Sequence, residues 1–202
     1  MHVIGLTGGI ACGKSTVSNR LRALGACILD ADEMAHELAE PGQALFRAYE
    51  RHFGAAVLME DGTLNRKAVG EIVFHHPEER KWMDDTAHPI LLDGLKKRME
   101  RCRASGKEIV VLDVPLLFEA GWDSFCDEVW VVFVPQETQE RRLMQRDRLT
   151  PEQARARINA QMSMEEKCRR ADVVIDNSGT MDENVRNVEK LFTGRWRSGK
   201  AL

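Results

Sequence analysis

The feature that most constrains the fold is an eight-residue stretch near the N-terminus, residues 8–15, which reads Gly-Gly-Ile-Ala-Cys-Gly-Lys-Ser. It matches the phosphate-binding loop pattern Gly-x-x-x-x-Gly-Lys-Ser/Thr in full. Glycines allow positive φ and a close approach to an anion, so the loop N–H groups converge on phosphate oxygens at a helix N-terminus. In such a loop Lys14 reaches the β and γ phosphates, and the Ser15 hydroxyl can ligate Mg²⁺. The pattern therefore predicts a nucleotide-binding site.

The sequence on either side of the loop fits that prediction. Residues 2–7 are apolar and partly β-branched, which predicts a short buried strand. After the loop, Val17, Leu21 and Leu24 recur at spacings of four and three, which predicts a helix that ends at Gly25. A strand, the loop and a helix in this order form the context that a phosphate-binding loop requires, and this context argues against a chance match.

Four further apolar runs, at residues 27–30, 108–113, 128–134 and 172–176, predict more strands. The two middle runs are almost continuously apolar, which is typical of parallel strands buried on both faces. Helical periodicity fills the intervals, and Pro77 and Pro89 stand where helices could begin. We therefore predict an α/β fold: a P-loop NTPase core with a five-stranded parallel sheet flanked by helices, a helical acceptor-binding insertion and a helical lid.

The predicted core comprises residues 1–42, 105–140 and 171–202, with the insertion at 43–104 and the lid at 141–170. The lid carries nine Lys and Arg against four Asp and Glu, a net charge of +5. Since the whole chain has a net charge of −3, the remaining residues carry −8. Most of these cations fit a solvated helical face with ordinary salt bridges. Arg142 and Arg146, four residues apart on one face, are instead expected to clamp the transferring phosphoryl group.

Carboxylates follow the second predicted strand, in the sequence Asp30-Ala31-Asp32. Ligands of open α/β sheets bind beyond the carboxyl ends of the strands, and a carboxylate there can orient an acceptor hydroxyl and take its proton. One of the two aspartates is expected to cap the next helix. We assign Asp32 to the chemistry and Asp30 to structure or to an indirect Mg²⁺ contact. Asp113 ends another strand and is a possible Walker-B-like acid.

Sequence features separate the classes of P-loop protein. The Asn-Lys-x-Asp motif of GTPases is missing, since the last predicted strand continues as Asn177-Ser178-Gly179, and AAA-type and helicase ATPases need more than 202 residues. A small-molecule kinase remains the preferred interpretation. Two alternatives stay open: a kinase for another small hydroxyl or nucleoside monophosphate acceptor, and a non-catalytic regulatory module that binds nucleotide.

Composition limits the partners and the compartment. The net charge of −3 argues against a nucleic-acid-wrapping protein, and no apolar run approaches the roughly 18 residues of a membrane span. Five scattered cysteines without a Cys-x-x-Cys pair predict neither a disulfide framework nor a zinc site, and no secretory signal is visible. We expect a cytoplasmic protein with no nucleic-acid or membrane partner. A monomer is favoured, although the sequence does not fix the oligomeric state. Cys12, inside the loop, is interpreted as a small tolerated residue, with oxidation sensitivity as the alternative.

Beyond the loop, the sequence resembles the dephospho-CoA kinase family along nearly its whole length. The resemblance rests on motifs in a fixed order: the loop with Thr16, Asp30-Ala31-Asp32, His88-Pro89, Pro115-Leu116-Leu117-Phe118-Glu119, Arg142-Leu143, Arg146-Asp147, Gln161 and Asp176-Asn177-Ser178-Gly179. One departure is His36, where many members carry Arg; if that Arg binds the acceptor, His36 would do so more weakly and with pH dependence.

The resemblance implies a Mg²⁺- and ATP-dependent kinase that phosphorylates the ribose 3′-hydroxyl of dephospho-CoA, giving CoA and ADP in the last step of coenzyme A biosynthesis. It implies that residues 43–104 bind CoA, that Asp32 is the catalytic base, and that Lys14 and Arg142 act on the phosphates. His88 and Leu116 would lie beside the acceptor, with Ser15 on the metal. The implied ATP-binding residues are Gly8, Gly9, Ile10, Ala11, Cys12, Gly13, Lys14, Ser15, Thr16, Arg146 and Asn177.

Overall fold

A computed structural model describes residues 1–196 of the chain. It divides the chain into two compact units, one made of Met1–Leu29 with the segment that follows from Cys102, the other of Asp30–Arg101. The second unit thus begins at Asp30, ahead of the insertion boundary expected at residue 43, and takes in the helix that follows Asp30.

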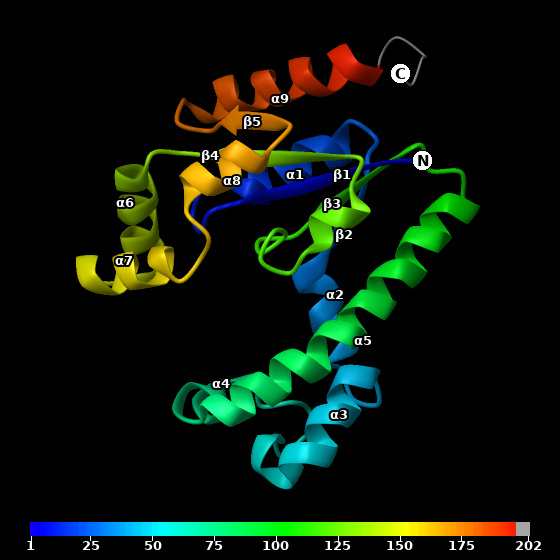
Figure 1. The fold of residues 1–202 in the computed structure, drawn as a ribbon, viewed down its shortest axis with the longest axis vertical. Coiled ribbons are helices and arrows are strands. Elements are labelled where there is room, and N and C mark those ends of the chain that lie inside the picture. The colour runs from blue at the N-terminus through cyan, green and yellow to red at the C-terminus, as the bar shows by residue number, and fades with distance from the viewer. Residues whose placement is uncertain (197–202) are drawn as a thin grey trace. The chain divides into compact units, whose positions relative to one another are not determined.

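The first unit is built on a five-stranded parallel sheet, as predicted (Figure 1). Its strand order is β2-β3-β1-β4-β5, so the first strand lies in the middle. In the register, Ile4 of β1 faces Val111 on one side and Glu128 on the other. The strands are β1 (His2–Gly8), β2 (Cys27–Asp30), β3 (Ile109–Asp113), β4 (Glu128–Phe133) and β5 (Val173–Asp176).

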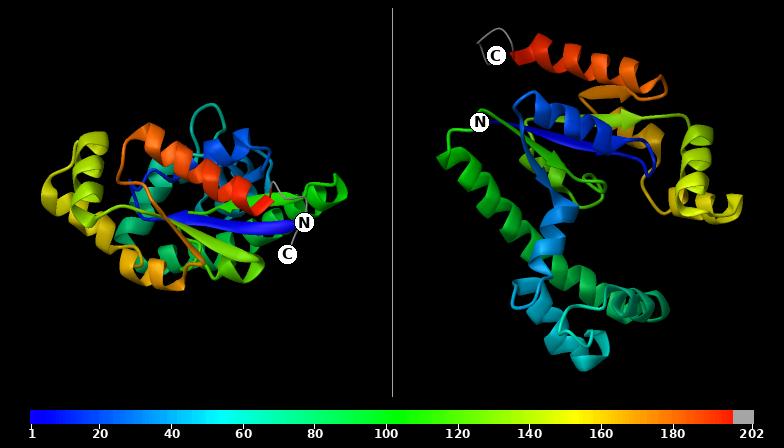
Figure 2. Two further views of the ribbon diagram at one scale, coloured as in Figure 1. Left: turned by 90° about the horizontal axis from the view of Figure 1, so that it is seen from above. Right: turned by 180° about the vertical axis from the view of Figure 1, so that it is seen from behind.

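Helices cover both faces of this sheet. Figure 2, left, shows α1 and α9 on one face and α8 on the other. The apolar runs of β1, β3 and β4 are almost entirely buried, with Ile4, Val111, Trp130 and Val132 all at 0% exposure in one core cluster. The edge strands differ, because β2 is half-buried and β5 alternates buried and exposed residues. The helical elements of this unit are α1 (Lys14–Ala23), η2 (Trp122–Phe125), α6 (Gln136–Asp147), α7 (Pro151–Asn159), α8 (Met164–Arg170) and α9 (Met181–Trp196).

Side-chain caps fix where the later helices begin. The Thr150 hydroxyl accepts from the Gln153 N–H while the Gln153 side chain accepts from the Thr150 N–H, a complete capping box at the start of α7. Thr180 and Glu183 make the same reciprocal pair before α9. Ser163 accepts the Glu166 N–H at α8. Each cap satisfies an N–H that the first helical turn leaves without a partner.

The second unit is helical. Its elements are α2 (Ala31–Leu38), α3 (Ala44–Phe53), η1 (Gly54–Val57), α4 (Arg66–His75) and α5 (Pro77–Ala104), the last of which ends just beyond the unit. Tyr49 and Phe53, one turn apart on α3, pack against Trp82 of α5, and His52 stacks on the same indole at 3.6 Å. Pro77 begins α5 as expected, but the start expected at Pro89 is wrong, because α5 continues through that residue. The proline removes one N–H donor from a 28-residue helix that continues on both sides of it.

All five cysteines are free thiols in the structure. Cys27 and Cys102 nevertheless bring their Sγ atoms to 3.1 Å in the first unit. Within residues 1–196, the helices include none with the length and apolar character that crossing a membrane requires.

Candidate active site

The phosphate-binding loop connects β1 to α1 at the carboxyl end of the central strand. Gly13, just before α1, has φ +83°, a left-handed conformation that disfavours a side chain. A Cβ at Gly8 would lie 2.7 Å from the Val132 carbonyl oxygen of the neighbouring strand, so this position also excludes one. The Cys12 N–H donates to the Gly9 carbonyl oxygen at 3.1 Å and closes the turn.

A buried ion pair lies directly beside the loop. The Lys14 Nζ donates to the Asp113 carboxylate, with the two side chains 16% and 3% exposed. Asp113 reaches this place because it ends β3 and faces Leu6 of β1 in the parallel register. Ser15, the next residue of α1, adds a hydroxyl. Hydroxyl and carboxylate oxygens are the hard donors that Mg²⁺ accepts together with phosphate oxygens, so these residues fit that ion. Residues 1–196 contain no cluster of three or more His, Cys, Asp or Glu able to hold a metal by itself.

Two predicted site residues from distant parts of the chain meet at the loop. Asn177, after β5, is buried and donates from Nδ2 to the Cys12 carbonyl oxygen at 2.7 Å. Arg142 of α6 donates from Nη2 to the Asn177 carbonyl oxygen at 3.2 Å. A Cβ at Gly13 would lie 2.3 Å from Asn177 Nδ2 and 3.8 Å from Arg142 Nη1. The side-chain oxygen of Asn177, Oδ1, is buried and has no hydrogen-bond donor among the described residues.

Arg146, one turn beyond Arg142, lies in a different environment. Its guanidinium forms two hydrogen bonds with the Asp147 carboxylate, at 2.8 and 3.1 Å, and Asp147 also binds Arg157 at 2.8 Å. The pKa of Arg146 is raised by that hydrogen-bonded carboxylate. Six of the nine cations of residues 141–170 pair with acids, as Arg146–Asp147, Arg155–Glu140, Arg157–Asp147, Lys167–Glu119, Arg169–Glu166 and Arg170–Asp123. Ordinary salt bridges thus account for most of this charge.

The segment after β3 is fixed by a buried lysine that charge patterning did not single out. Lys167 of α8 is 0% exposed, and its Nζ donates to the Pro115 carbonyl oxygen at 3.0 Å and to Glu119 Oε2 at 3.3 Å. The same ammonium lies 3.0 Å from Glu119 Oε1. The Thr7 hydroxyl donates to the same carbonyl oxygen. Burial raises the pKa of the Glu119 carboxyl, but the Met162 N–H and Lys167 outweigh burial and hold it below its usual value.

The remaining predicted residues have different surroundings. Leu116, in the fixed segment, is 45% exposed. Cys12 is fully buried in the main core cluster, and burial raises its pKa against the opposing effects of two backbone N–H groups, Arg142 and Lys167. The helix N-terminus therefore does not lower the pKa of this thiol, and its burial favours the interpretation as a small tolerated residue.

Asp32 and His88 belong to the second unit. Asp30 is the cap of α2, because its Oδ1 accepts from the N–H groups of Asp32 and Glu33 at 2.8 and 3.1 Å. Asp32 therefore lies in the first turn of α2, and its carboxylate is not the cap. His88 lies on α5 next to Pro89. The His36 carbonyl oxygen accepts from Arg66 at 3.4 Å.

The sequence interpretation missed two glutamines that touch the loop. Gln139 Nε2 donates to the Ile10 carbonyl oxygen, and the Ile10 N–H donates to Gln161 Oε1, each at 2.9 Å. No spacing rule singles out Gln139. Gln161 stood among the residues of the family resemblance, with no role attached to it.

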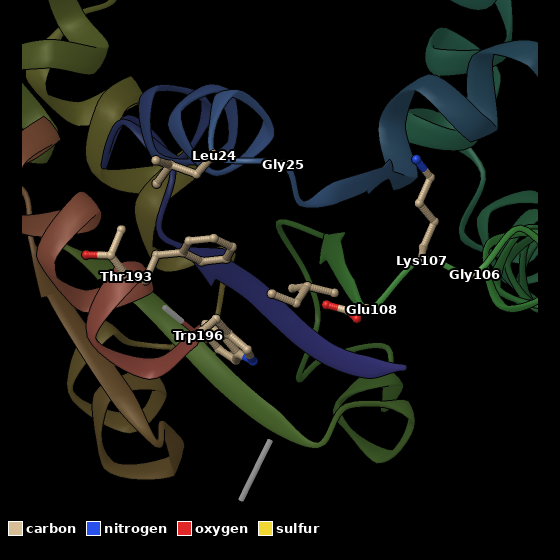
Figure 3. Close-up of a pocket in the computed structure, with 9 residues that line it drawn as sticks. Leu24, Gly25, Gly106, Lys107, Glu108, Thr193 and Trp196 are labelled. Carbon is tan, nitrogen blue, oxygen red and sulfur yellow. The ribbon is translucent and has the colours of Figure 1, made fainter. Parts of the chain in front are cut away.

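A hollow of about 470 Å³ opens at the other end of the strands (Figure 3). It lies where α1 ends and β3 begins, with Leu24, Lys107 and Trp196 in its wall. Because the loop residues lie at the carboxyl ends of the strands, this hollow is separate from the loop site.

The parallel sheet, the complete phosphate-binding loop and the lysine–aspartate pair beside it define a P-loop nucleotide-binding protein. In fold alone, the chain is similar to shikimate kinase from Aquifex aeolicus, with a TM-score of 0.51 and 18% identity over 96% of this chain and 98% of that one.

The sequence comparisons are more specific, and they place the chain in the dephospho-CoA kinase family, whose model matches residues 2–183. A dephospho-CoA kinase from Symbiobacterium thermophilum is 50% identical over 192 residues, which cover 95% of this chain and 80% of that protein. The solved dephospho-CoA kinase from Campylobacter jejuni has a TM-score of 0.75 and 29% identity, with 98% of each chain covered.

Proposed function

We propose that this enzyme transfers the γ-phosphoryl group of ATP to the ribose 3′-hydroxyl of dephospho-CoA, giving CoA and ADP in the last step of coenzyme A biosynthesis. The observation that carries the proposal is the complete phosphate-binding loop, with the Lys14–Asp113 pair beside it, in a chain of this family.

On the ATP side, residues 8–16 cradle the phosphates through loop N–H groups, and Lys14 binds the β and γ oxygens. A phosphate oxygen competes with Asp113 for the Lys14 ammonium, so nucleotide binding loosens the pair seen here. Arg142, held by the Asn177 carbonyl next to Gly13, adds positive charge where the transferring group becomes more negative. Arg146 joins it by exchanging Asp147 for a phosphate oxygen, and Asn177 contacts the nucleotide from the β5 side.

Ser15 is the proposed protein ligand of Mg²⁺, with Asp113 close to the same place. When bound with ATP, the ion neutralises phosphate charge and helps to align the phosphates. The protein residues supply the rest: they bind the nucleotide, fix its orientation and exclude water, because an open site would hydrolyse ATP.

On the acceptor side, Asp32 is the proposed general base that orients the 3′-hydroxyl and accepts its proton. His88 and Leu116 are proposed to contact dephospho-CoA. Residues 43–104 form the proposed CoA-binding insertion and residues 141–170 the lid, on the core made of residues 1–42, 105–140 and 171–202. We further propose a cytoplasmic monomer, and the five free thiols fit a reducing compartment.

A coupled ADP-release assay tests the function. Purified enzyme with ATP and Mg²⁺ is given dephospho-CoA, AMP, CMP, adenosine or no acceptor, and CoA is identified by mass. We expect turnover with dephospho-CoA to exceed that with the other acceptors by at least about 100-fold, since a site that binds the whole acceptor uses that binding energy in the transition state. Equal turnover with a nucleoside monophosphate, or ADP binding without any acceptor-dependent turnover, refutes the proposal.

A further inference from the structure

The backbone N–H and the carbonyl oxygen of one loop residue, Ile10, each form a hydrogen bond with a glutamine side chain from a distant part of the chain. The Ile10 N–H donates to Gln161 Oε1 and the Ile10 carbonyl oxygen accepts from Gln139 Nε2, each at 2.9 Å. Gln139 lies on α6 and is 1% exposed, whereas Gln161 lies in the connection between α7 and α8. Backbone polarity fixes both amide orientations, because an N–H requires an oxygen and a carbonyl requires an N–H group.

Close packing accompanies these hydrogen bonds. A Cβ at Gly9 would lie 2.1 Å from Gln139 Nε2 and 2.8 Å from the Met164 sulfur of α8. The space beside Gly9 is therefore already filled by side chains of α6 and α8. The loop backbone between Gly9 and Ile10 rests directly on the helical segment of residues 136–170.

This arrangement has two consequences for the loop. The Ile10 N–H is committed to Gln161 and the Cys12 N–H to the Gly9 carbonyl oxygen, so phosphate recognition falls to the remaining loop N–H groups, and the loop holds its shape before a ligand arrives. Gln139 and Arg142 are three residues apart on α6 and so share one face of that helix. The contact that fixes Ile10 thus also sets the position of the Arg142 guanidinium, which reaches the Asn177 carbonyl.

We propose that Gln139 and Gln161 are positioning residues that preorganise the phosphate-binding loop and couple it to α6 and the α7–α8 connection. Both residues act through the backbone of Ile10, which they contact directly. The proposal concerns nucleotide affinity in the first place, and only its effect on turnover rests on the proposed kinase activity.

The test compares Gln161→Met, which keeps the length of the side chain and loses the acceptor, with Gln161→Glu, which keeps an acceptor oxygen. Gln139→Met removes the donor on the other side. Gln145→Met is the matched control, because Gln145 is exposed on the same helix α6. For each full-length variant, ADP affinity is measured by calorimetry, the KM values for ATP and dephospho-CoA by the ADP-release assay, and Tm by circular dichroism.

We expect Gln161→Met and Gln139→Met to weaken ADP binding about 5- to 50-fold, as for a lost hydrogen bond that leaves a backbone group unpaired. The KM for ATP rises in parallel, the KM for dephospho-CoA stays within about twofold, and Gln145→Met matches the wild type. Gln161→Glu binds ADP more tightly than Gln161→Met. Its remaining loss of ADP affinity relative to the wild type comes from repulsion between the new carboxylate and the ADP phosphates, so added salt reduces that loss.

The proposal is overturned if Gln161→Met folds and binds ADP as tightly as the wild type. It is also overturned if Gln161→Glu binds ADP no more tightly than Gln161→Met at any salt concentration. If Gln139→Met fails to fold, the two Gln161 variants still test the proposal, because Gln161 is less buried than Gln139. A wild type that binds ADP but turns over no dephospho-CoA refutes the proposed function alone, since calorimetry tests the loop without an acceptor.

Discussion

The buried Lys167 gives the sharpest stability prediction. Its ammonium is 0% exposed and is bonded at 3.0 Å to the Glu119 carboxylate and at 3.0 Å to the Pro115 carbonyl oxygen. Removing one partner of a buried ion pair costs about 3–5 kcal/mol. Here the cost is smaller, because the Glu119 side chain is 25% exposed and keeps the Met162 N–H, and Pro115 keeps the Thr7 hydroxyl. We therefore expect Lys167→Met to lose about 2–3 kcal/mol of unfolding free energy.

That loss corresponds to a fall in Tm of about 4–12 °C for a chain of this size. Urea and thermal unfolding at pH 7, followed by circular dichroism, measure it. The double variant Lys167→Met/Glu119→Gln removes the charge left without its partner and should recover to within about 1 kcal/mol of the wild type. A single variant that loses less than about 0.5 kcal/mol, or a double variant as unstable as the sum of the two single changes, refutes the reasoning.

The same pair has a pH signature. The pKa of Glu119 lies below its ordinary value of 4.5, so in the wild type its contribution is present above that value and is lost as the pH falls through the lowered pKa. Removing Lys167 takes away two of the effects that lower the pKa of Glu119, so acid destabilises the variant less than the wild type at this site. The stability gap between wild type and Lys167→Met should therefore shrink between pH 7 and pH 4. A gap that widens over that range contradicts the assignment.

Three further predictions concern the site. Asp32→Asn should lower kcat by roughly 100-fold or more with ADP affinity nearly unchanged, as for loss of a general base, and near-normal kcat would remove Asp32 from that role. Lys14→Met should lower kcat/KM for ATP by about 100-fold or more and also weaken ADP binding, measured by steady-state kinetics and calorimetry, and intact ADP affinity would argue against the proposed phosphate contact. Gly9→Ala should weaken ADP binding at least about 10-fold, because its Cβ would lie 2.1 Å from Gln139 Nε2. Its control is Gly70→Ala on α4, where an added Cβ would meet no atom within 4 Å. This change should leave ADP binding unaltered and raise the free energy of unfolding by about 1 kcal/mol. Weaker ADP binding by Gly70→Ala would show that the Gly9 effect is not specific to the loop.

Local patterns were enough to predict much of the core. The runs that became β3 and β4 are buried on both faces, so their apolar character is continuous and easy to detect. The caps at Thr150, Ser163 and Thr180 are hydrogen bonds between residues three apart in the sequence, the kind of contact that a local pattern can encode. Pro89 shows the limit of such rules, because a helix can continue through a proline and lose a single hydrogen bond.

The sequence by itself determined the phosphate-binding loop, because its glycines, lysine and serine are contiguous and their chemistry depends on the local backbone. The tertiary structure decided what holds that loop. Asp113, Gln139, Gln161 and Asn177 reach residues 10–14 from separate elements, at sequence distances that no periodicity encodes. It also decided that Lys167, one of nine cations in a basic stretch, is buried against Glu119, since charge patterning records the sign of a residue and not its burial.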